Sequence, residues 1–240
     1  YIIIGVVVIV MLVAIGIYAV INSNSQSKKQ LEENSTNIEG TTNTENSTKE
    51  NNTENKDEYI QNNQISNESE ENNMYSTGKH HAEIVVKNYG TIVLELDADV
   101  APITVENFAN LVNEGFYNGL TFHRIISGFM IQGGDLGNGT GGSSKTIKGE
   151  FASNGVKNSI SHVRGTISMA RSSMPNSASS QFFIVHQDST FLDGQYAAFG
   201  TVTSGMEVVD KICADTAVED DNGTVAKNNQ PVIEKITIID

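Results

Sequence analysis

The stretch FHRIISGFMIQGGD, residues 122–135, places an arginine inside a segment that is otherwise apolar enough for a protein core. Arg124 cannot shed its charge in a protein, and burying that charge without a partner is costly. As a regular strand, the stretch would turn Phe122, Arg124 and Ile126 to the same face. A structural arginine would pair with a carboxylate such as Glu150. Composition alone leaves open whether the arginine is structural or functional.

Composition divides the 240 residues into three parts. Residues 1–21 are an unbroken apolar run, and roughly 20 helical residues cross a bilayer core of about 30 Å, so we expect a transmembrane anchor. Residues 22–78 are rich in Asn, Ser, Thr and Glu and bury too little apolar surface to fold, which predicts a disordered linker. Residues 79–240 have the regular apolar spacing of one globular domain.

The expected anchor predicts a single-pass protein of the cell membrane. A polar linker of this kind suits a domain displayed on the extracellular face, which is the orientation we expect. Lys28 and Lys29 follow the apolar run and favour the opposite orientation under the positive-inside rule. Cleavage of the run as a signal peptide, which would give a secreted protein, is the alternative.

The formal net charge of −14 argues against nucleic acid as a partner, because phosphate binding requires a basic surface. Cys213 is the only cysteine in the sequence, so no internal disulfide can form and no cysteine cluster can hold a metal. Its spacing in VVDKICADTA is that of a core residue in a helix.

The globular part predicts many short strands and two helices. A hairpin is expected around Asn88-Tyr89-Gly90, one helix between Pro102 and the capping Gly115, and a second helix over 204–214. Further strands are expected at 121–125, 129–133, 165–170, 181–185, 197–202 and 232–239. Since no βαβ alternation is present, the pattern predicts a mainly β fold, a closed antiparallel structure whose ends the helices cap.

Other motifs do not support a cofactor or a metal. GNGTGG, residues 137–142, lacks the following helix that a dinucleotide site requires and is better interpreted as a loop or groove wall. VEDDNG, residues 218–223, lacks the ligand spacing of an EF-hand and indicates a solvated turn. His80 and His81 should point to opposite faces of a strand. The serines offer no G-x-S-x-G elbow and no obvious Ser-His-Asp set.

Three segments favour a functional role for Arg124 over a structural one: YNGLTFHRIISGFMIQGGD (117–135), GTISMARSSMPNSASSQFFIV (165–185) and FLDGQYAAFG (191–200). In this order and spacing they resemble the cyclophilin family of peptidyl-prolyl cis-trans isomerases, over about residues 81–240. The resemblance implies an eight-stranded antiparallel β-barrel closed by two α-helices. It also implies acceleration of rotation about X-Pro bonds without a cofactor.

The resemblance further implies a catalytic role for Arg124. It implies substrate-binding roles for a set of positions along one groove: Phe129, Met130, Gln132, Ala170, Arg171, Gln181, Phe183, Phe191, Leu192 and Tyr196. Four of these would form the hydrophobic proline pocket, namely Phe129, Met130, Phe183 and Leu192. Phe191 and Tyr196 stand where many eukaryotic members carry Trp and His, and they are similar to bacterial members.

The expected function is therefore a peptidyl-prolyl isomerase that assists protein folding, acts as a monomer, and binds proline-containing peptides and folding proteins. The alternative is a proline-peptide-binding or chaperone-like module in which turnover is incidental. A surface adhesion protein is a third interpretation, and it rests on the polar linker alone.

Overall fold

The computed structural model describes residues 74–137 and 141–240. The expected anchor and almost all of the expected linker lie outside the described residues. Within the described ranges, no helix is long and apolar enough to cross a membrane. Tyr75, near the start, already packs against the core, and its hydroxyl accepts a hydrogen bond from Asn113 Nδ2 at 3.0 Å.

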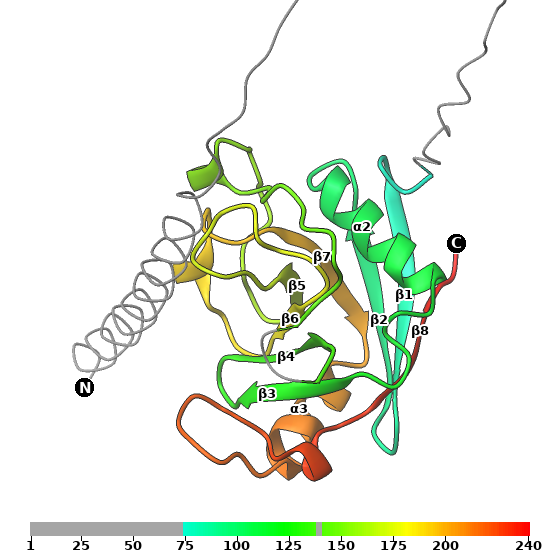
Figure 1. Cartoon of the computed structure of the whole chain (residues 1–240), viewed down its shortest axis with the longest axis vertical. Coiled ribbons are helices and arrows are strands. Elements are labelled where there is room, and N and C mark those ends of the chain that lie inside the picture. The colour runs from blue at the N-terminus through cyan, green and yellow to red at the C-terminus, as the bar shows by residue number, and fades with distance from the viewer. Residues whose placement is uncertain (1–73, 138–140) are drawn as a thin grey trace, which may run out of the picture. The chain divides into compact units, whose positions relative to one another are not determined.

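The described residues form one antiparallel sheet of eight strands, which curves around the core (Figure 1). The spatial order is β3-β4-β6-β5-β7-β2-β1-β8. The strands are β1 (Lys79–Val86), β2 (Gly90–Asp97), β3 (Thr121–Ile126), β4 (Met130–Asp135), β5 (Thr166–Met169), β6 (Phe182–Val185), β7 (Ala198–Ser204) and β8 (Ile233–Ile238). Each expected strand is confirmed, with differences of a few residues at the ends.

The expectation of a fully closed barrel is wrong, because β3 and β8 end the sheet order and no ladder joins them. Among the described residues these two edges meet only through an isolated bridge, Thr121 to Val232, and neighbouring backbone hydrogen bonds. Phe122 N–H, for example, donates to Pro231 O at 2.9 Å. Pro231 has no N–H of its own and cannot return a hydrogen bond, which limits the pairing beside β8.

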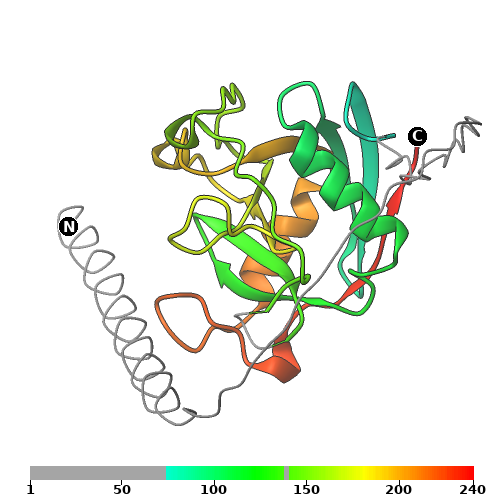
Figure 2. The same ribbon diagram turned by 45° about the horizontal axis from the view of Figure 1, so that its top comes forward.

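Two α-helices cover this sheet, α2 (Pro102–Asn113) and α3 (Met206–Asp215), and both were expected from the sequence. Helix α2 packs against β2 and β8, whereas α3 packs against β2 (Figure 2). Gly115 adopts a positive φ of 70° after α2, and its N–H donates to Val112 O, as its predicted capping role requires. Cys213 is buried on α3, and burial raises the pKa of its thiol to about 11.

The apolar side chains form two separate clusters. The main core lies between the sheet and the helices and is rich in aromatic rings, including Phe108, Tyr117 and Phe182. A smaller cluster contains Met130, Phe183, Val185 and Leu192. This second cluster belongs to the site described below.

Glu150 is buried at 2% exposure and caps helix α2 from a distant part of the chain. Ala101, the residue before the helix, offers no side-chain cap. Glu150 Oε1 instead accepts a hydrogen bond from Ile103 N–H at 3.1 Å, and its Oε2 accepts from Thr104 N–H at 2.8 Å and Thr104 Oγ1 at 2.6 Å. Negative charge at a helix N-terminus also interacts favourably with the helix dipole. The possible pairing of Glu150 with Arg124 is therefore wrong.

We predict that Glu150→Ala lowers the free energy of unfolding by about 2–3 kcal/mol, because it leaves buried N–H groups at the start of α2 without an acceptor. Urea denaturation measures this difference. Glu114→Ala, which removes an exposed carboxylate at the other end of the same helix, should change stability by less than about 0.5 kcal/mol. Equal effects of the two substitutions would contradict the capping role.

Candidate functional site

Arg124 lies at an irregularity in the pairing of β3 with β4. Phe122 pairs with Gly133, but the next paired position on β3 is Arg124, opposite Gln132, so the register shifts by one residue. Such a bulge inserts an extra residue and re-aims the side chains that follow. Phe122 and Ile125 both join the main core, whereas Ile126 packs against the smaller cluster. The expectation that Phe122 shares a face with Arg124 is wrong for this reason.

The guanidinium of Arg124 has neutral hydrogen-bond partners. Its Nε donates to Asn222 O at 2.8 Å, its Nη2 donates to Asn222 Oδ1 at 3.1 Å, and its Nη1 donates to Gln132 Oε1 at 3.2 Å. Burial lowers the pKa of Arg124, while Tyr196 and Asp220 act in the opposite direction. An arginine in this setting still keeps its charge near neutral pH.

Asn222 belongs to the segment that the sequence indicated as a solvated turn. The Asp220 carboxylate closes this loop by accepting hydrogen bonds from Thr224 N–H at 3.0 Å and Thr224 Oγ1 at 2.8 Å. Gly223 has a φ of 81°, and an added Cβ there would lie 2.3 Å from Ile125 O. Ile125 N–H donates to Gly223 O at 2.8 Å, so the loop is fixed against β3. No sequence pattern indicated Asn222 as a partner of Arg124.

Two glutamines extend the hydrogen bonding of Arg124 across the groove. Gln132 Nε2 donates to Gln181 Oε1 at 2.8 Å, and Gln181 Nε2 donates to Asp135 Oδ1 at 3.1 Å and to Gly141 O at 2.6 Å. Each amide oxygen accepts from one side and each amide nitrogen donates to the other. The chain therefore links the arginine to the buried carboxylate of Asp135, and linked hydrogen bonds of this kind polarise one another.

The structure brings the four expected pocket residues together beside Arg124. Met130, Phe183 and Leu192 are buried in the smaller cluster, and Phe129 packs against it. The same cluster includes residues that the sequence analysis had either assigned to other parts of the groove or missed: Ile126, Ala170, Val185 and Tyr196. Met130 Sδ lies 4.0 Å from Arg124 Nη1, so the apolar cluster and the guanidinium adjoin.

Two aromatic residues lie beside this apolar cluster. The Tyr196 ring meets Phe183 edge-on, with ring centroids 5.9 Å apart. Phe191 is 71% exposed, and its ring lies 5.6 Å from that of Phe129. The exposed Phe191 ring therefore extends the apolar surface beside the buried cluster.

A cavity of about 500 Å³ adjoins the pocket on the side of the two glutamines. It is lined by Gln132, Gly141, Gly142, Ser143, Thr146, Ala170, Arg171, Ser172, Ser177, Ser179 and Gln181. The Arg171 guanidinium lies 4.7 Å from the centroid of the Tyr196 ring, and its Nη2 donates to Gln195 O at 2.8 Å. The Ala170 N–H donates to Gln181 O at 2.9 Å and is therefore engaged within the protein.

Residues 81–239 match the family model described as cyclophilin type peptidyl-prolyl cis-trans isomerase/CLD. The chain belongs to the cyclophilin family of peptidyl-prolyl cis-trans isomerases. It is 46% identical over 158 residues to a probable peptidyl-prolyl cis-trans isomerase of Brucella suis, covering 60% of this chain and 76% of the relative. It is 49% identical over 128 residues to an isomerase of Helicobacter pylori, covering 52% of this chain and 76% of the relative.

A solved cyclophilin of Cryptosporidium parvum, studied in the presence of the dipeptide Ala-Pro, has a TM-score of 0.59 to this chain and 31% sequence identity. The similarity covers 67% of this chain and 99% of that one. The relatives and the family model agree on activity, so the present chain is a peptidyl-prolyl cis-trans isomerase.

Two histidines that the sequence had assigned to opposite faces of a strand reach the same carboxylate in this cyclophilin. His80 Nδ1 lies 2.5 Å from Asp240 Oδ2, and His81 Nδ1 lies 3.2 Å from Asp240 Oδ1. The Asp240 side chain follows β8 and spans both rings at the start of β1. Within the described ranges, no group of three or more His, Cys, Asp or Glu side chains is arranged to hold a metal ion.

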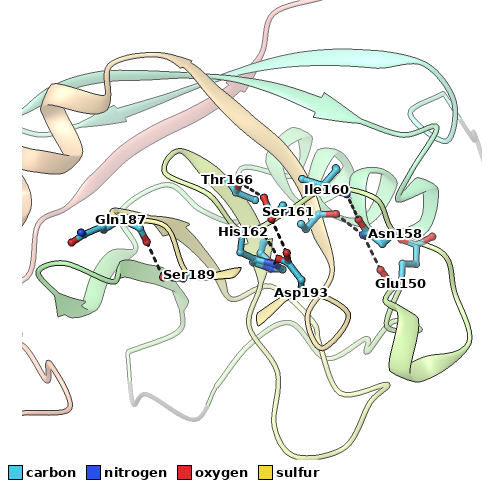
Figure 3. Close-up of polar contacts among 11 residues, drawn as sticks. Glu150, Asn158, Ile160, Ser161, His162, Thr166, Gln187, Ser189 and Asp193 are labelled. Atoms are coloured by element: carbon cyan, nitrogen blue, oxygen red, sulfur yellow. Dashed lines mark hydrogen bonds and ion pairs between the residues drawn. The ribbon is translucent and has the colours of Figure 1, made fainter. Parts of the chain in front are cut away.

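A buried histidine supports the pocket of this cyclophilin from behind. The His162 ring stacks on Phe183 with centroids 6.0 Å apart. Its Nδ1 lies 2.8 Å from Asp193 Oδ1, a contact visible in Figure 3, and its Nε2 lies 3.0 Å from Ser168 Oγ. Asp193, His162 and Ser168 are hydrogen-bonded in the same sequence of contacts as the Asp, His and Ser of a hydrolytic triad, an arrangement that was not expected from the sequence. Ser168 is fully buried, however, so its hydroxyl is not accessible to a substrate.

We predict that the free energy of unfolding of this cyclophilin decreases as the pH is lowered, partly because of His162. Burial lowers the pKa of His162, while the hydrogen bond to Asp193 acts in the opposite direction. The unfolded chain therefore binds this proton first, near the ordinary histidine value of about 6.5, and stability is lost as the pH falls below it. Urea unfolding gives the free energy of unfolding of the wild type and of His162→Gln at each pH between about 7.5 and 5. The slopes of this free energy against pH should differ between the two proteins by the equivalent of about one bound proton. Parallel curves would refute the assignment.

Proposed function

We propose that Arg124 is the group through which this isomerase lowers the barrier to rotation about an X-Pro bond. That barrier is about 18–20 kcal/mol, because resonance gives the C–N bond double-bond character. In the twisted state resonance is lost, and the proline nitrogen regains a lone pair that can accept a hydrogen bond. A donor aimed at that nitrogen stabilises the transition state over the ground state.

The contacts of Arg124 support this role. A guanidinium has five N–H groups in a rigid plane. Asn222 and Gln132 hold three of them, which fixes the plane. The two remaining N–H groups lie on Nη1 and Nη2. The one on Nη1 faces only the weak acceptor Met130 Sδ, at 4.0 Å, in the apolar cluster. A proline ring seated in that cluster would bring its nitrogen to these donors.

We propose that Phe129, Met130, Phe183 and Leu192 enclose the proline ring, with Phe191 and Tyr196 at the rim. Gln132, Gln181 and the backbone of Ala170 and Arg171 would hold the flanking peptide, through the groups not engaged within the protein. The burial of these apolar side chains in one cluster supports this assignment. The presence of Ala-Pro with the Cryptosporidium parvum cyclophilin supports proline-containing peptides as ligands.

The test is an isomerisation assay on a short X-Pro peptide with the full chain. Arg124→Ala should lower kcat/KM by about 100-fold or more, the usual effect of removing a donor to a transition state. Lys235→Ala, which removes an exposed cation of β8, should leave activity unchanged. Circular dichroism should show that both variants keep the fold. Nearly full activity of a folded Arg124→Ala protein would refute the role of the arginine.

A holding role toward unfolded chains is the second candidate function. The observation that favours it is the exposed Phe191, which enlarges the apolar surface beside the pocket. If binding is the main function, Arg124→Ala should still delay aggregation of an unfolded client as well as wild type does. The isomerase role predicts instead that the variant no longer accelerates proline-limited refolding.

We also propose that residues 1–21 anchor the protein in the cell membrane and that residues 22–78 tether a monomeric isomerase domain outside it. The apolar run and the polar linker support this proposal. A random coil of about 57 residues would span roughly 40 Å, so the domain could reach clients near the membrane surface.

Protease protection tests this topology. In intact cells, an added protease should remove the domain from the membrane fraction, and alkaline carbonate should not extract the untreated full chain. Recovery of the domain in the medium would indicate signal cleavage. Protection of the domain until the membrane is permeabilised would contradict the proposed orientation.

A further inference from the structure

The tight turn between β3 and β4 carries Phe129 to the pocket. Phe129 N–H donates to Ile126 O at 2.9 Å, which closes a four-residue turn. Gly128, the third residue of the turn, has a φ of 82°, whereas Ser127 does not have a positive φ. This combination is that of a type II turn, which differs from type I in the orientation of its central peptide. The N–H of that central peptide belongs to Gly128.

His186 holds this central peptide from outside the turn. Gly128 N–H donates to His186 Nδ1 at 2.8 Å. The backbone N–H of His186 also donates to Phe129 O at 2.8 Å. One residue therefore contacts the central peptide of the turn through its ring and the Phe129 carbonyl, at the end of the turn, through its backbone.

The ring contact determines the protonation state of His186. Because a backbone N–H can only donate, Nδ1 must be the unprotonated nitrogen, and the ring proton lies on Nε2. Nε2 lies 3.1 Å from Asp210 Oδ1 on α3, which can accept that proton's hydrogen bond. The neutral ring is thus oriented from both sides, by Gly128 and by Asp210.

Several charged or titratable groups surround this contact. Arg164, before β5, lies 2.8 Å from the Asp210 carboxylate through Nη2 and donates from Nη1 to His186 O at 2.8 Å. Asp188 accepts a hydrogen bond from Arg164 N–H. The Cys213 thiol on α3 lies close enough to Asp210 and Arg164 to interact with both, and burial raises its pKa.

We propose that His186 is a positioning residue for the proline pocket: its neutral imidazole fixes the central peptide of the 126–129 turn, so protonation loosens the turn that carries Phe129 and weakens peptide binding. The inference rests on the proposed role of Phe129 in that pocket. A protonated ring would direct an Nδ1–H at the Gly128 N–H, two donors facing each other. The central peptide would then lose its acceptor, and the turn would lose the contact that selects its conformation.

Loss of the hydrogen bond between His186 and Gly128 should weaken peptide binding more than it slows turnover. Arg124 is held by Asn222 and Gln132, neither of which belongs to the turn. Loss of the His186 contact should therefore raise KM while changing kcat less. The expected rise in KM is roughly fivefold, the factor that corresponds to one typical hydrogen bond.

The experiment compares the full-length wild type with His186→Asn and His186→Ala. Asn offers an amide oxygen on the same atom from which Nδ1 branches in histidine, so it can accept from Gly128 at every pH. Ala offers no acceptor. NMR measures the affinity for an X-Pro peptide and the rate of its cis-trans exchange on the enzyme. The measurements run between about pH 7.5 and 5.5, the range in which histidines change charge. The Gly128 amide signal reports directly on the turn.

We expect the wild type to lose peptide affinity toward low pH. At pH 7.5 the His186→Ala variant should bind the peptide roughly fivefold more weakly. The His186→Asn variant should bind about as well as the wild type and should keep its affinity at low pH. Any contribution of His123 and His162 to the pH dependence of peptide affinity is the same in all three proteins and cancels in the comparison. If His186→Ala binds the peptide as tightly as the wild type, or if His186→Asn loses as much affinity at low pH as the wild type, the proposal is refuted.

If His186→Ala fails to fold, the comparison of the wild type with His186→Asn still tests the proposal. An active wild type with unaffected variants would refute this inference alone, whereas an inactive wild type would refute the proposed function.

Discussion

The guanidinium of Arg124 must keep its charge satisfied while leaving donors available to a substrate. A carboxylate partner would neutralise the charge and compete for those donors. The structure instead surrounds Arg124 with amide oxygens, from Asn222 on one side and Gln132 on the other. The nearest charge in the hydrogen-bonded chain is Asp135, two glutamines away. This arrangement suits a donor that acts on a nitrogen lone pair in a groove lined by apolar groups.

Several features of the fold follow from that requirement. The bulge in β3 turns Arg124 toward the groove while Phe122 and Ile125 stay in the main core. The loop that carries Asn222 is held against β3 by Gly223, where any side chain would collide with Ile125 O. These constraints are local and steric, and together with the hydrogen bonds to Asn222 and Gln132 they fix the plane of the guanidinium.

The sheet separates two apolar clusters with different purposes. The main core stabilises the domain, and the smaller cluster contains the residues of the proposed proline pocket. Polar residues lie behind the pocket: His162 supports Phe183, and His186 contacts the turn that carries Phe129. Each histidine ring lies within hydrogen-bond distance of an aspartate, Asp193 for His162 and Asp210 for His186, so both rings are held in place beside the smaller cluster.

Local sequence patterns determined the elements of this protein. Alternation and turn residues predicted the β1–β2 hairpin, and Pro102 and Gly115 predicted the ends of α2, because these signals arise within a few residues along the chain. The groove residues were predicted from the resemblance of three motif segments to cyclophilins. Only the tertiary structure decided the partners. Arg124 and Asn222 are 98 residues apart, Gly128 and His186 are 58 apart, and Glu150 caps a helix 46 residues upstream. The open edge beside Pro231 and the bulge at Arg124 were likewise not predictable, since both depend on how one strand registers against another rather than on the strand itself.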